Sequence, residues 1–241
     1  MTQNQCKLSV NINKIATLRN SRGGNTPSVV EAAKRIQGFG AQGITIHPRP
    51  DERHIRYQDA RDLMPVVYTE YNIEGNPQHN FIDLVLECKP TQVTLVPDAI
   101  GALTSNAGWD TIKNQSYLKE VISEFQRNGI RTSIFVDPVL EMIEGAKETG
   151  TERIELYTES FAHEYGLGNK DGILPYVAAA KLANELGLGI NAGHDLSLDN
   201  IQFFNQNIPG LLEVSIGHAL ISESLYLGLE NVVNMYLQKL K

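Results

Sequence analysis

Residues 43–54 of the chain read Gly-Ile-Thr-Ile-His-Pro-Arg-Pro-Asp-Glu-Arg-His. The β-branched run at 43–46 predicts a short strand that is buried on both faces. His47 stands where this strand ends, and two prolines predict a stiff loop after it. That loop carries three side chains suited to anions, Arg49, Arg53 and His54. An imidazole at a strand end followed by such side chains favours an enzyme that holds a phosphate while it moves protons. The alternative is a solvated loop with a satisfied histidine.

The same unit, a short apolar strand followed by a helix pattern, recurs along the whole chain. Strands are predicted at 7–12, 43–47, 71–73, 92–96, 131–136, 153–157, 188–192 and 213–216. Strands that alternate with helices imply right-handed βαβ units and a parallel sheet. Eight units without a linker-like stretch predict one (β/α)8 TIM barrel domain over residues 1–241. An open doubly wound sheet is the alternative, but it would place functional residues at a single switch point.

Helix patterns fill most of the intervals between the strands. They are predicted at 26–39, 57–67, 78–88, 111–128, 140–149, 171–186, 198–205 and 222–240. The first of these is expected to begin with Thr26 as the capping hydroxyl and proline at the first helical position. Residues 14–24 are predicted as a basic loop and 158–170 as a polar segment, while the long loop after Pro97 suits a lid. The spacing Gly38-x-Gly40-x-x-Gly43 precedes a strand, so it predicts a helix C-cap and not a dinucleotide site.

Composition excludes several classes of partner. The formal net charge of the 241 residues is −7, which argues against nucleic acid and against an acidic membrane surface. The first residues lack the apolar run of a signal peptide, and no later stretch is apolar enough to span a bilayer. Two distant cysteines, Cys6 and Cys88, predict buried reduced thiols. We therefore expect a cytoplasmic protein.

Polar residues at the strand ends are the strongest functional signal. In a barrel the carboxyl ends of all strands meet at one mouth, where such enzymes place their active sites. Six polar residues stand at these ends: Asn11, His47, Glu74, Glu155, His194 and His218. Three histidines and two carboxylates at one mouth indicate acid–base chemistry. Taken singly, each residue also has a structural interpretation; Glu155, for example, could pair with an arginine inside the barrel.

Two other mechanisms fit the sequence less well. A zinc site would need histidines at ligand spacing, and His163-Glu164 begins the helical zinc motif without its second histidine. A Schiff-base enzyme would need a lysine at the end of strands five to seven, and only Lys14, in the first loop, is near the mouth. Phosphate binding is better supported, because Gly217 and a helix start follow the last strand. A second anion site is predicted from Arg22, Arg49 and His54, so we expect either a bisphosphate or two phosphorylated small-molecule substrates.

Several ordered motifs resemble the pyridoxine 5′-phosphate synthase family. They are Asn11-x-x-x-Ile-Ala-Thr-Leu-Arg-Asn-x-Arg22, Gly43-Ile-Thr-Ile-His47-x-Arg49, Asp51-x-Arg53-His54-Ile55, Asn191-Ala-Gly-His194 and Ile216-Gly-His218-Ala. The resemblance implies a (β/α)8 barrel with extra helices that assembles as a homo-octamer. It further implies condensation of 3-amino-2-oxopropyl phosphate with 1-deoxy-D-xylulose 5-phosphate to pyridoxine 5′-phosphate, phosphate and water. No metal or organic cofactor is implied.

The resemblance also implies roles for individual residues. His47 and Glu74 are similar to the family's proton acceptors, His194 to its proton donor, and Glu155 to a carboxylate that stabilises a cationic transition state. The contacts implied for the aminoketone phosphate are Asn11, Arg22, Gly217 and His218. Those implied for deoxyxylulose phosphate are Arg49, His54 and Thr104, the last lying in the expected lid.

The chain departs from the family pattern at two places. Asn13-Lys14 stands where the pattern has Asp-His, and Asp195 stands where it has glycine. We expect substrate contacts at all three positions, through the backbone N–H in the case of Asp195. Two other functions remain open on the residues alone. One is a phosphosugar isomerase or epimerase with a single phosphate site, and the other is a non-catalytic barrel that binds a sugar phosphate.

Overall fold

A computed structural model describes residues 5–98 and 107–241 of the chain, and Thr104 therefore lies outside the described residues. Eight parallel strands form a closed barrel in sequence order, with the first strand paired to the last. The strands are β1 (Lys7–Asn11), β2 (Gly43–Ile46), β3 (Glu70–Gly75), β4 (Gln92–Leu95), β5 (Arg131–Val136), β6 (Arg153–Tyr157), β7 (Gly189–Gly193) and β8 (Leu211–Ile216). This confirms the predicted (β/α)8 barrel and excludes the open sheet.

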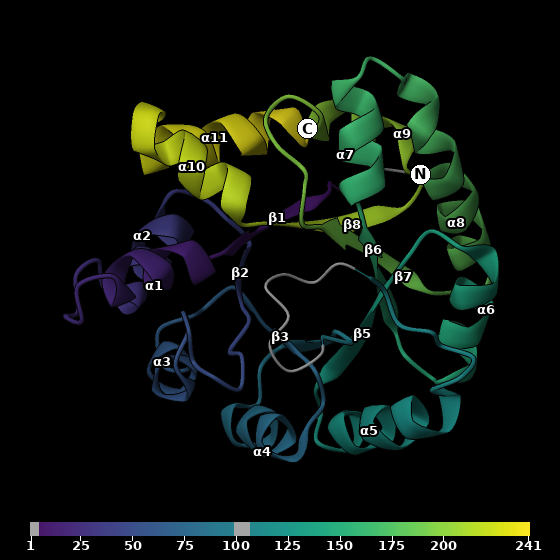
Figure 1. The fold of residues 1–241 in the computed structure, drawn as a ribbon, viewed down its shortest axis with the longest axis horizontal. Coiled ribbons are helices and arrows are strands. Elements are labelled where there is room, and N and C mark those ends of the chain that lie inside the picture. The colour runs from purple at the N-terminus through teal and green to yellow at the C-terminus, as the bar shows by residue number, and fades with distance from the viewer. Residues whose placement is uncertain (1–4, 99–106) are drawn as a thin grey trace.

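Helices surround the strands on the outside (Figure 1). They are α1 (Asn13–Asn20), α2 (Val29–Gly38), α3 (Tyr57–Leu63), α4 (His79–Cys88), α5 (Gln115–Arg127), α6 (Leu140–Glu148), α7 (Glu159–Gly166), α8 (Leu174–Glu185), α9 (Ile201–Asn207), α10 (His218–Leu227) and α11 (Leu229–Lys239), with a 3₁₀ turn η1 (Lys170–Ile173). Within the described chain, α1, α7 and α10 stand outside the pattern of one helix per strand. Each of the three follows a strand directly, at the mouth of the barrel.

Three predictions about the helices were wrong. Residues 14–24 were expected to form a loop, but most of them belong to α1, in which the buried Arg19 pairs with Asp59 of α3. The polar segment 158–170 contains α7, which is anchored by the fully buried Phe161. The last helix is two helices, α10 and α11, because Gly228 adopts a φ of 84° between them. In each case a tertiary contact or a single backbone angle outweighs the local pattern.

Smaller differences concern where the helices begin and end. Helix α2 begins after Ser28, whose hydroxyl accepts a hydrogen bond from the N–H of Glu31, and not after Thr26. Helix α5 begins at Gln115, four residues later than expected, and α8 begins at Leu174, after η1. The glycine spacing was interpreted correctly, since α2 ends at Gly38 and Gly40 has a φ of 105°. Both cysteines are buried and unbridged.

Successive side chains along each strand point alternately toward the helices and into the barrel. Residues such as Leu8, Val10 and Ile44 are fully buried in the apolar cluster that they form with the helices. The other face of each strand points into the barrel, and there the side chains are mostly polar, from Ser9 and Thr45 to Asn72, Thr94 and Asn191. A barrel interior is more often filled with branched apolar residues. The hydrophobic stabilisation of this fold therefore lies between sheet and helices, while hydrogen bonds hold the interior.

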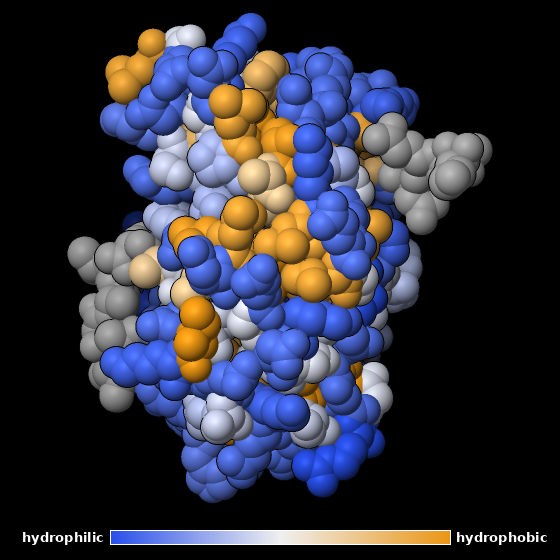
Figure 2. Space-filling view, turned by 90° about the vertical axis from the view of Figure 1, so that its right-hand side faces the viewer, coloured by the Kyte–Doolittle hydropathy of each residue, from blue (hydrophilic) through white to orange (hydrophobic). Residues whose placement is uncertain are grey.

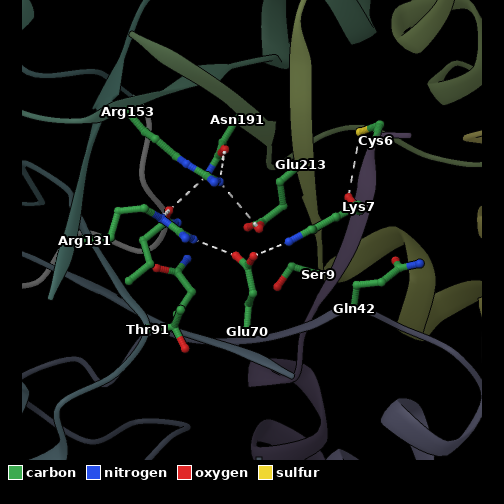
Figure 3. A network of polar contacts seen from close by, with 12 residues as sticks. Cys6, Lys7, Ser9, Gln42, Glu70, Thr91, Arg131, Arg153, Asn191 and Glu213 are labelled. Carbon is green, nitrogen blue, oxygen red and sulfur yellow. Dashed lines mark hydrogen bonds and ion pairs between the residues drawn. The ribbon is translucent and has the colours of Figure 1, made fainter. Parts of the chain in front are cut away.

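A charged network occupies the end of the interior farthest from the mouth (Figure 3). Glu70 forms ion pairs with Lys7 and with Arg131, at 2.6 Å from the latter. Glu213 lies 3.9 Å from Arg153, which also donates to Asn191 at 3.1 Å. Burial and the neighbouring carboxylate of Glu70 raise the pKa of Glu213 to about 8. Burial alone would raise the pKa of Glu70, but hydrogen bonds from Lys7 and Arg131 outweigh it and lower that pKa to about 2.

Candidate active site

A cavity of about 350 Å³ opens at the carboxyl ends of the strands. Thr104 lies outside the described residues, and all the other residues that the sequence proposed for the site line this cavity, apart from Arg22. They are Asn11, Asn13, Lys14, His47, Arg49, His54, Glu74, Glu155, His194, Asp195, Gly217 and His218. Arg22 is exposed in the turn after α1 and does not line the cavity within this chain. The barrel topology thus brings residues from six separate segments of the chain together in one cavity.

His47 occupies the position after β2 that the sequence predicted, and the surrounding polar atoms fix it. Its backbone N–H donates to Asn13 Oδ1 at 2.9 Å, and Asn13 is in turn held by Asn11. Its Nε2 lies 3.5 Å from Asp98 Oδ2, and its Nδ1 lies 4.0 Å from Glu74 Oε2. Burial, followed by the positive charge of Arg49, lowers the pKa of His47 well below its usual value. His47 is therefore a neutral imidazole able to accept a proton.

Two carboxyl groups in the cavity have pKa values displaced in the opposite direction. Burial, together with the charges of Glu155 and Asp98, raises the pKa of Glu74 well above its usual value. Burial raises the pKa of Glu155 to about 7, although the nearby His194 partly opposes the shift. Among the described residues, Oε2 of Glu155 is buried without a hydrogen-bond partner. A cation that entered the cavity would stabilise both carboxylates and draw their pKa values down.

Groups that bind anions flank the acid–base groups. Arg49 is buried and reaches Asp98 Oδ2 at 2.9 Å. Burial and the charges of Arg49 and Lys14 lower the pKa of His54 to about 4, and its Nδ1 accepts from the N–H of Ile55 at 2.8 Å. The proton of neutral His54 therefore resides on Nε2. On the other side of the mouth, α10 begins at His218 directly after Gly217, so its free N–H groups border the cavity.

Sequence reasoning missed several residues that line or shape the cavity. Asp98 contacts both His47 and Arg49, and Phe135, Val96 and Ser215 complete the wall. Phe135 and Ser215 lie within strands that the sequence located correctly, so counting alternate residues inward from each strand end would have found them. Asp98 gave a weaker signal, because it follows Pro97 in the expected lid and not a strand end. Its role depends on a contact between the loops after β2 and β4.

Neither a metal centre nor a membrane span is found in the part of the chain that the structure describes. Across residues 5–98 and 107–241, no group of three or more histidine, cysteine, aspartate or glutamate side chains is arranged to hold a metal ion. No helix within the same residues is both long and apolar enough to cross a bilayer.

The barrel and its mouth define a (β/α)8-barrel enzyme whose cavity places titratable groups between groups of a kind suited to anions. The model of one protein family, described as pyridoxal phosphate biosynthesis protein PdxJ, matches residues 8–241. The chain belongs to this family. Pyridoxine 5′-phosphate synthase of Flavobacterium johnsoniae is 86% identical to it over 98% of this chain and 99% of its own. The enzyme of the same name from Christiangramia forsetii is 70% identical over the same shares of the two chains.

Solved structures with little sequence identity share the fold. A 3-keto-L-gulonate-6-phosphate decarboxylase from Vibrio cholerae aligns with a TM-score of 0.64 at 8% identity, over 98% of each chain. A phosphoribosylanthranilate isomerase from Thermotoga maritima aligns with a TM-score of 0.61 at 14% identity, again over 98% of each chain. At these identities the likeness concerns the barrel alone.

Proposed function

We propose that the chain is a pyridoxine 5′-phosphate synthase of vitamin B6 biosynthesis, which condenses 3-amino-2-oxopropyl phosphate with 1-deoxy-D-xylulose 5-phosphate. The observation that carries the proposal is one cavity in which neutral His47, the carboxyls of Glu74 and Glu155, and His194 lie between two anion-binding borders. The reaction joins two phosphorylated substrates and moves several protons, so it needs both kinds of group in one place.

We assign the proton transfers as follows. His47 and Glu74 accept protons and His194 donates one, while Glu155 stabilises positive charge as the amine condenses with the ketone. Burial disfavours the charged form of Glu74 and raises its pKa, which favours the protonated carboxyl. The ammonium group of the aminoketone would stabilise the carboxylate and so release Glu74 to act as a base.

We assign the phosphates to the two borders of the cavity. The aminoketone phosphate would lie at the N-terminus of α10, on Gly217 and His218, with Asn11 beside it and Arg22 as a further contact. The deoxyxylulose phosphate would lie on Arg49 and His54, with Thr104 as an additional contact. The low pKa of His54 leaves Nε2–H as a neutral donor until a phosphate arrives. Asn13 and Lys14 are proposed as further substrate contacts, since both line the cavity.

We also propose that the protein acts in the cytoplasm as a homo-octamer. A formal charge of −7 and buried free thiols support a cytoplasmic location. Exposed apolar surface supports self-association, and Figure 2 shows apolar residues gathered on the face that carries α6 and α8. Leu140 of α6 is 45% exposed and Leu174 of α8 is 59% exposed. Light scattering at working concentration would give the mass, and a value near that of one chain would overturn the octamer.

The decisive test is synthesis from the two substrates. Purified protein should release pyridoxine 5′-phosphate and inorganic phosphate when both substrates are present, and neither product when one is omitted. His47→Asn should reduce kcat by about a hundredfold or more while the protein stays folded, because it removes a general base. If the chain forms no product under conditions in which the Flavobacterium johnsoniae enzyme does, the proposed function is wrong.

A further inference from the structure

The turn after β7 presents His194 to the cavity in a fixed backbone conformation. His194 has a φ of 96°, a left-handed value that a residue with a Cβ rarely adopts. Its N–H donates to Ser215 O at 3.5 Å, and the preceding carbonyl of Gly193 accepts from Thr158 Oγ1 at 2.6 Å. Ser215 of β8 and Thr158, which directly follows β6, therefore hold this strained conformation in place.

Asp195, the next residue, is held as firmly. Its N–H donates to Thr158 Oγ1 at 3.4 Å, and its carbonyl accepts from Asn200 Nδ2 at 3.4 Å. With both backbone groups engaged, the side chain turns back, and Oδ2 lies 2.9 Å from Nδ1 of His194. A carboxylate has only acceptors, so Nδ1 must carry the proton of this hydrogen bond. The N–H that we expected to contact substrate thus has a partner within the chain.

Because Asp195 occupies Nδ1, Nε2 is the ring atom of His194 that can exchange a proton with substrate. Tyr157 of β6 packs edge-on against the ring with the centroids 5.5 Å apart. Glu155 of β6 and His47 after β2 act on His194 through their charges, and the charges of Asp137 and Glu159 act on Tyr157. The proton on Nδ1 stays in its hydrogen bond to Asp195 whether the ring is neutral or charged. Any proton that His194 gives to substrate must then leave from Nε2.

We propose that Asp195 is a positioning residue that fixes the tautomer of His194 and stabilises its imidazolium form for proton donation. Asp195 acts through His194 and not on the substrate itself, and the proposal rests on the proposed function for the identity of the reaction. In the step concerned, the Nε2–H bond of the imidazolium breaks and its electron pair stays on the ring. The proton passes to the departing hydroxyl group, which leaves as water, while the Nδ1–H bond to Asp195 is unchanged.

The test compares three variants by two independent readouts. Asp195→Asn keeps the size of the side chain and removes its charge, and Asp195→Glu keeps the charge. Asp199→Asn is the matched control, because it removes one negative charge from an exposed residue four positions along. The first readout is hydrogen–deuterium exchange at Cε1 of His194, followed by mass spectrometry across pH without substrate. The second is the pH profile of synthase activity.

Asp195→Asn should move the midpoint of the His194 exchange curve to lower pH, because the carboxylate in contact with Nδ1 favours the charged form of the ring. The basic limb of the kcat profile should move with it, and kcat near neutral pH should fall about tenfold with KM changed less than threefold. Asp195→Glu should restore part of the shift, and Asp199→Asn should cause none.

An unchanged exchange midpoint in Asp195→Asn would overturn the proposal, as would an equal shift in Asp199→Asn. These outcomes are distinct from a failure of the proposed function. If the wild-type protein made no pyridoxine 5′-phosphate, the exchange curves would still report whether Asp195 controls the protonation of His194.

Discussion

Glu155 illustrates how burial prepares a single residue for chemistry at neutral pH. Its pKa of about 7, raised by burial, means that it is protonated in mildly acidic solution and ionised in mildly basic solution. A carboxylate that stabilises a cation must be ionised, so kcat/KM, which reports the protein without substrate, should rise with pH through about 7. In Glu155→Gln we expect kcat to fall by about a hundredfold and this acidic limb to disappear. Steady-state kinetics of Glu155→Gln from pH 5.5 to 8.5 would check this prediction. If the acidic limb persisted in the variant, a group other than Glu155 would be responsible for it.

Gly193 illustrates a steric requirement at the same place. A Cβ there would lie 2.7 Å from Ser215 O and 2.9 Å from Glu155 Oε1, closer than such atoms approach. Gly193→Ala should therefore destabilise the fold by about 1–3 kcal/mol and displace Glu155, which lowers activity as well. Gly38→Ala is the control, since its Cβ would meet no atom within 4 Å and it ends a helix. Urea unfolding measures both; equal stability of the two variants would contradict the packing argument.

At the scale of elements, α1 depends on one buried ion pair. Arg19 is 1% exposed, and it donates to both carboxylate oxygens of Asp59 and to the carbonyl of His54. The same contacts join α1 to α3 and to the loop that carries His54. Removing one partner leaves a buried charge uncompensated, so Arg19→Met should cost about 3–5 kcal/mol in the free energy of unfolding.

An exposed pair of the same type serves as the comparison. Arg35 and Glu31 form an i,i+4 pair on α2, with side chains 66% and 54% exposed. Arg35→Met should change stability by no more than about 0.5 kcal/mol, because water screens the pair. Chemical denaturation of Arg19→Met and Arg35→Met measures the free energy of unfolding that each variant loses. A loss below 1 kcal/mol in Arg19→Met would mean that α1 is held by something other than this ion pair.

At the scale of the whole molecule, the interior network makes stability depend on pH. The pKa of Glu213 is raised to about 8 in the folded barrel, so its protonated form favours folding. That contribution is complete below the unfolded value near 4.5 and is lost as pH rises toward 8. Glu70, with a pKa lowered to about 2, acts in the opposite sense: its contribution is present above the unfolded value of 4.5 and is lost as pH falls from there to about 2.

Glu213→Gln keeps an uncharged side chain at every pH and should remove this dependence. Relative to wild type, the variant should gain roughly 2 kcal/mol or more between pH 4.5 and pH 8. Thermal unfolding across that range measures the difference, with Glu148→Gln on exposed α6 surface as the control. A constant difference between Glu213→Gln and wild type would show that Glu213 does not titrate in this window.

Local sequence patterns were enough to predict the strands, their alternation with helices and most of the groups at the mouth. β-branched runs form buried strands, and residues at the carboxyl ends of the parallel strands of a barrel lie at its mouth. Tertiary structure alone decided that residues 13–20 form a helix, because Arg19 finds Asp59 only after folding. It alone brought Asp98 to His47 and turned the carboxylate of Asp195 toward His194. Such pairings depend on how loops meet in space and on single backbone angles, and neither leaves a periodic trace in the chain.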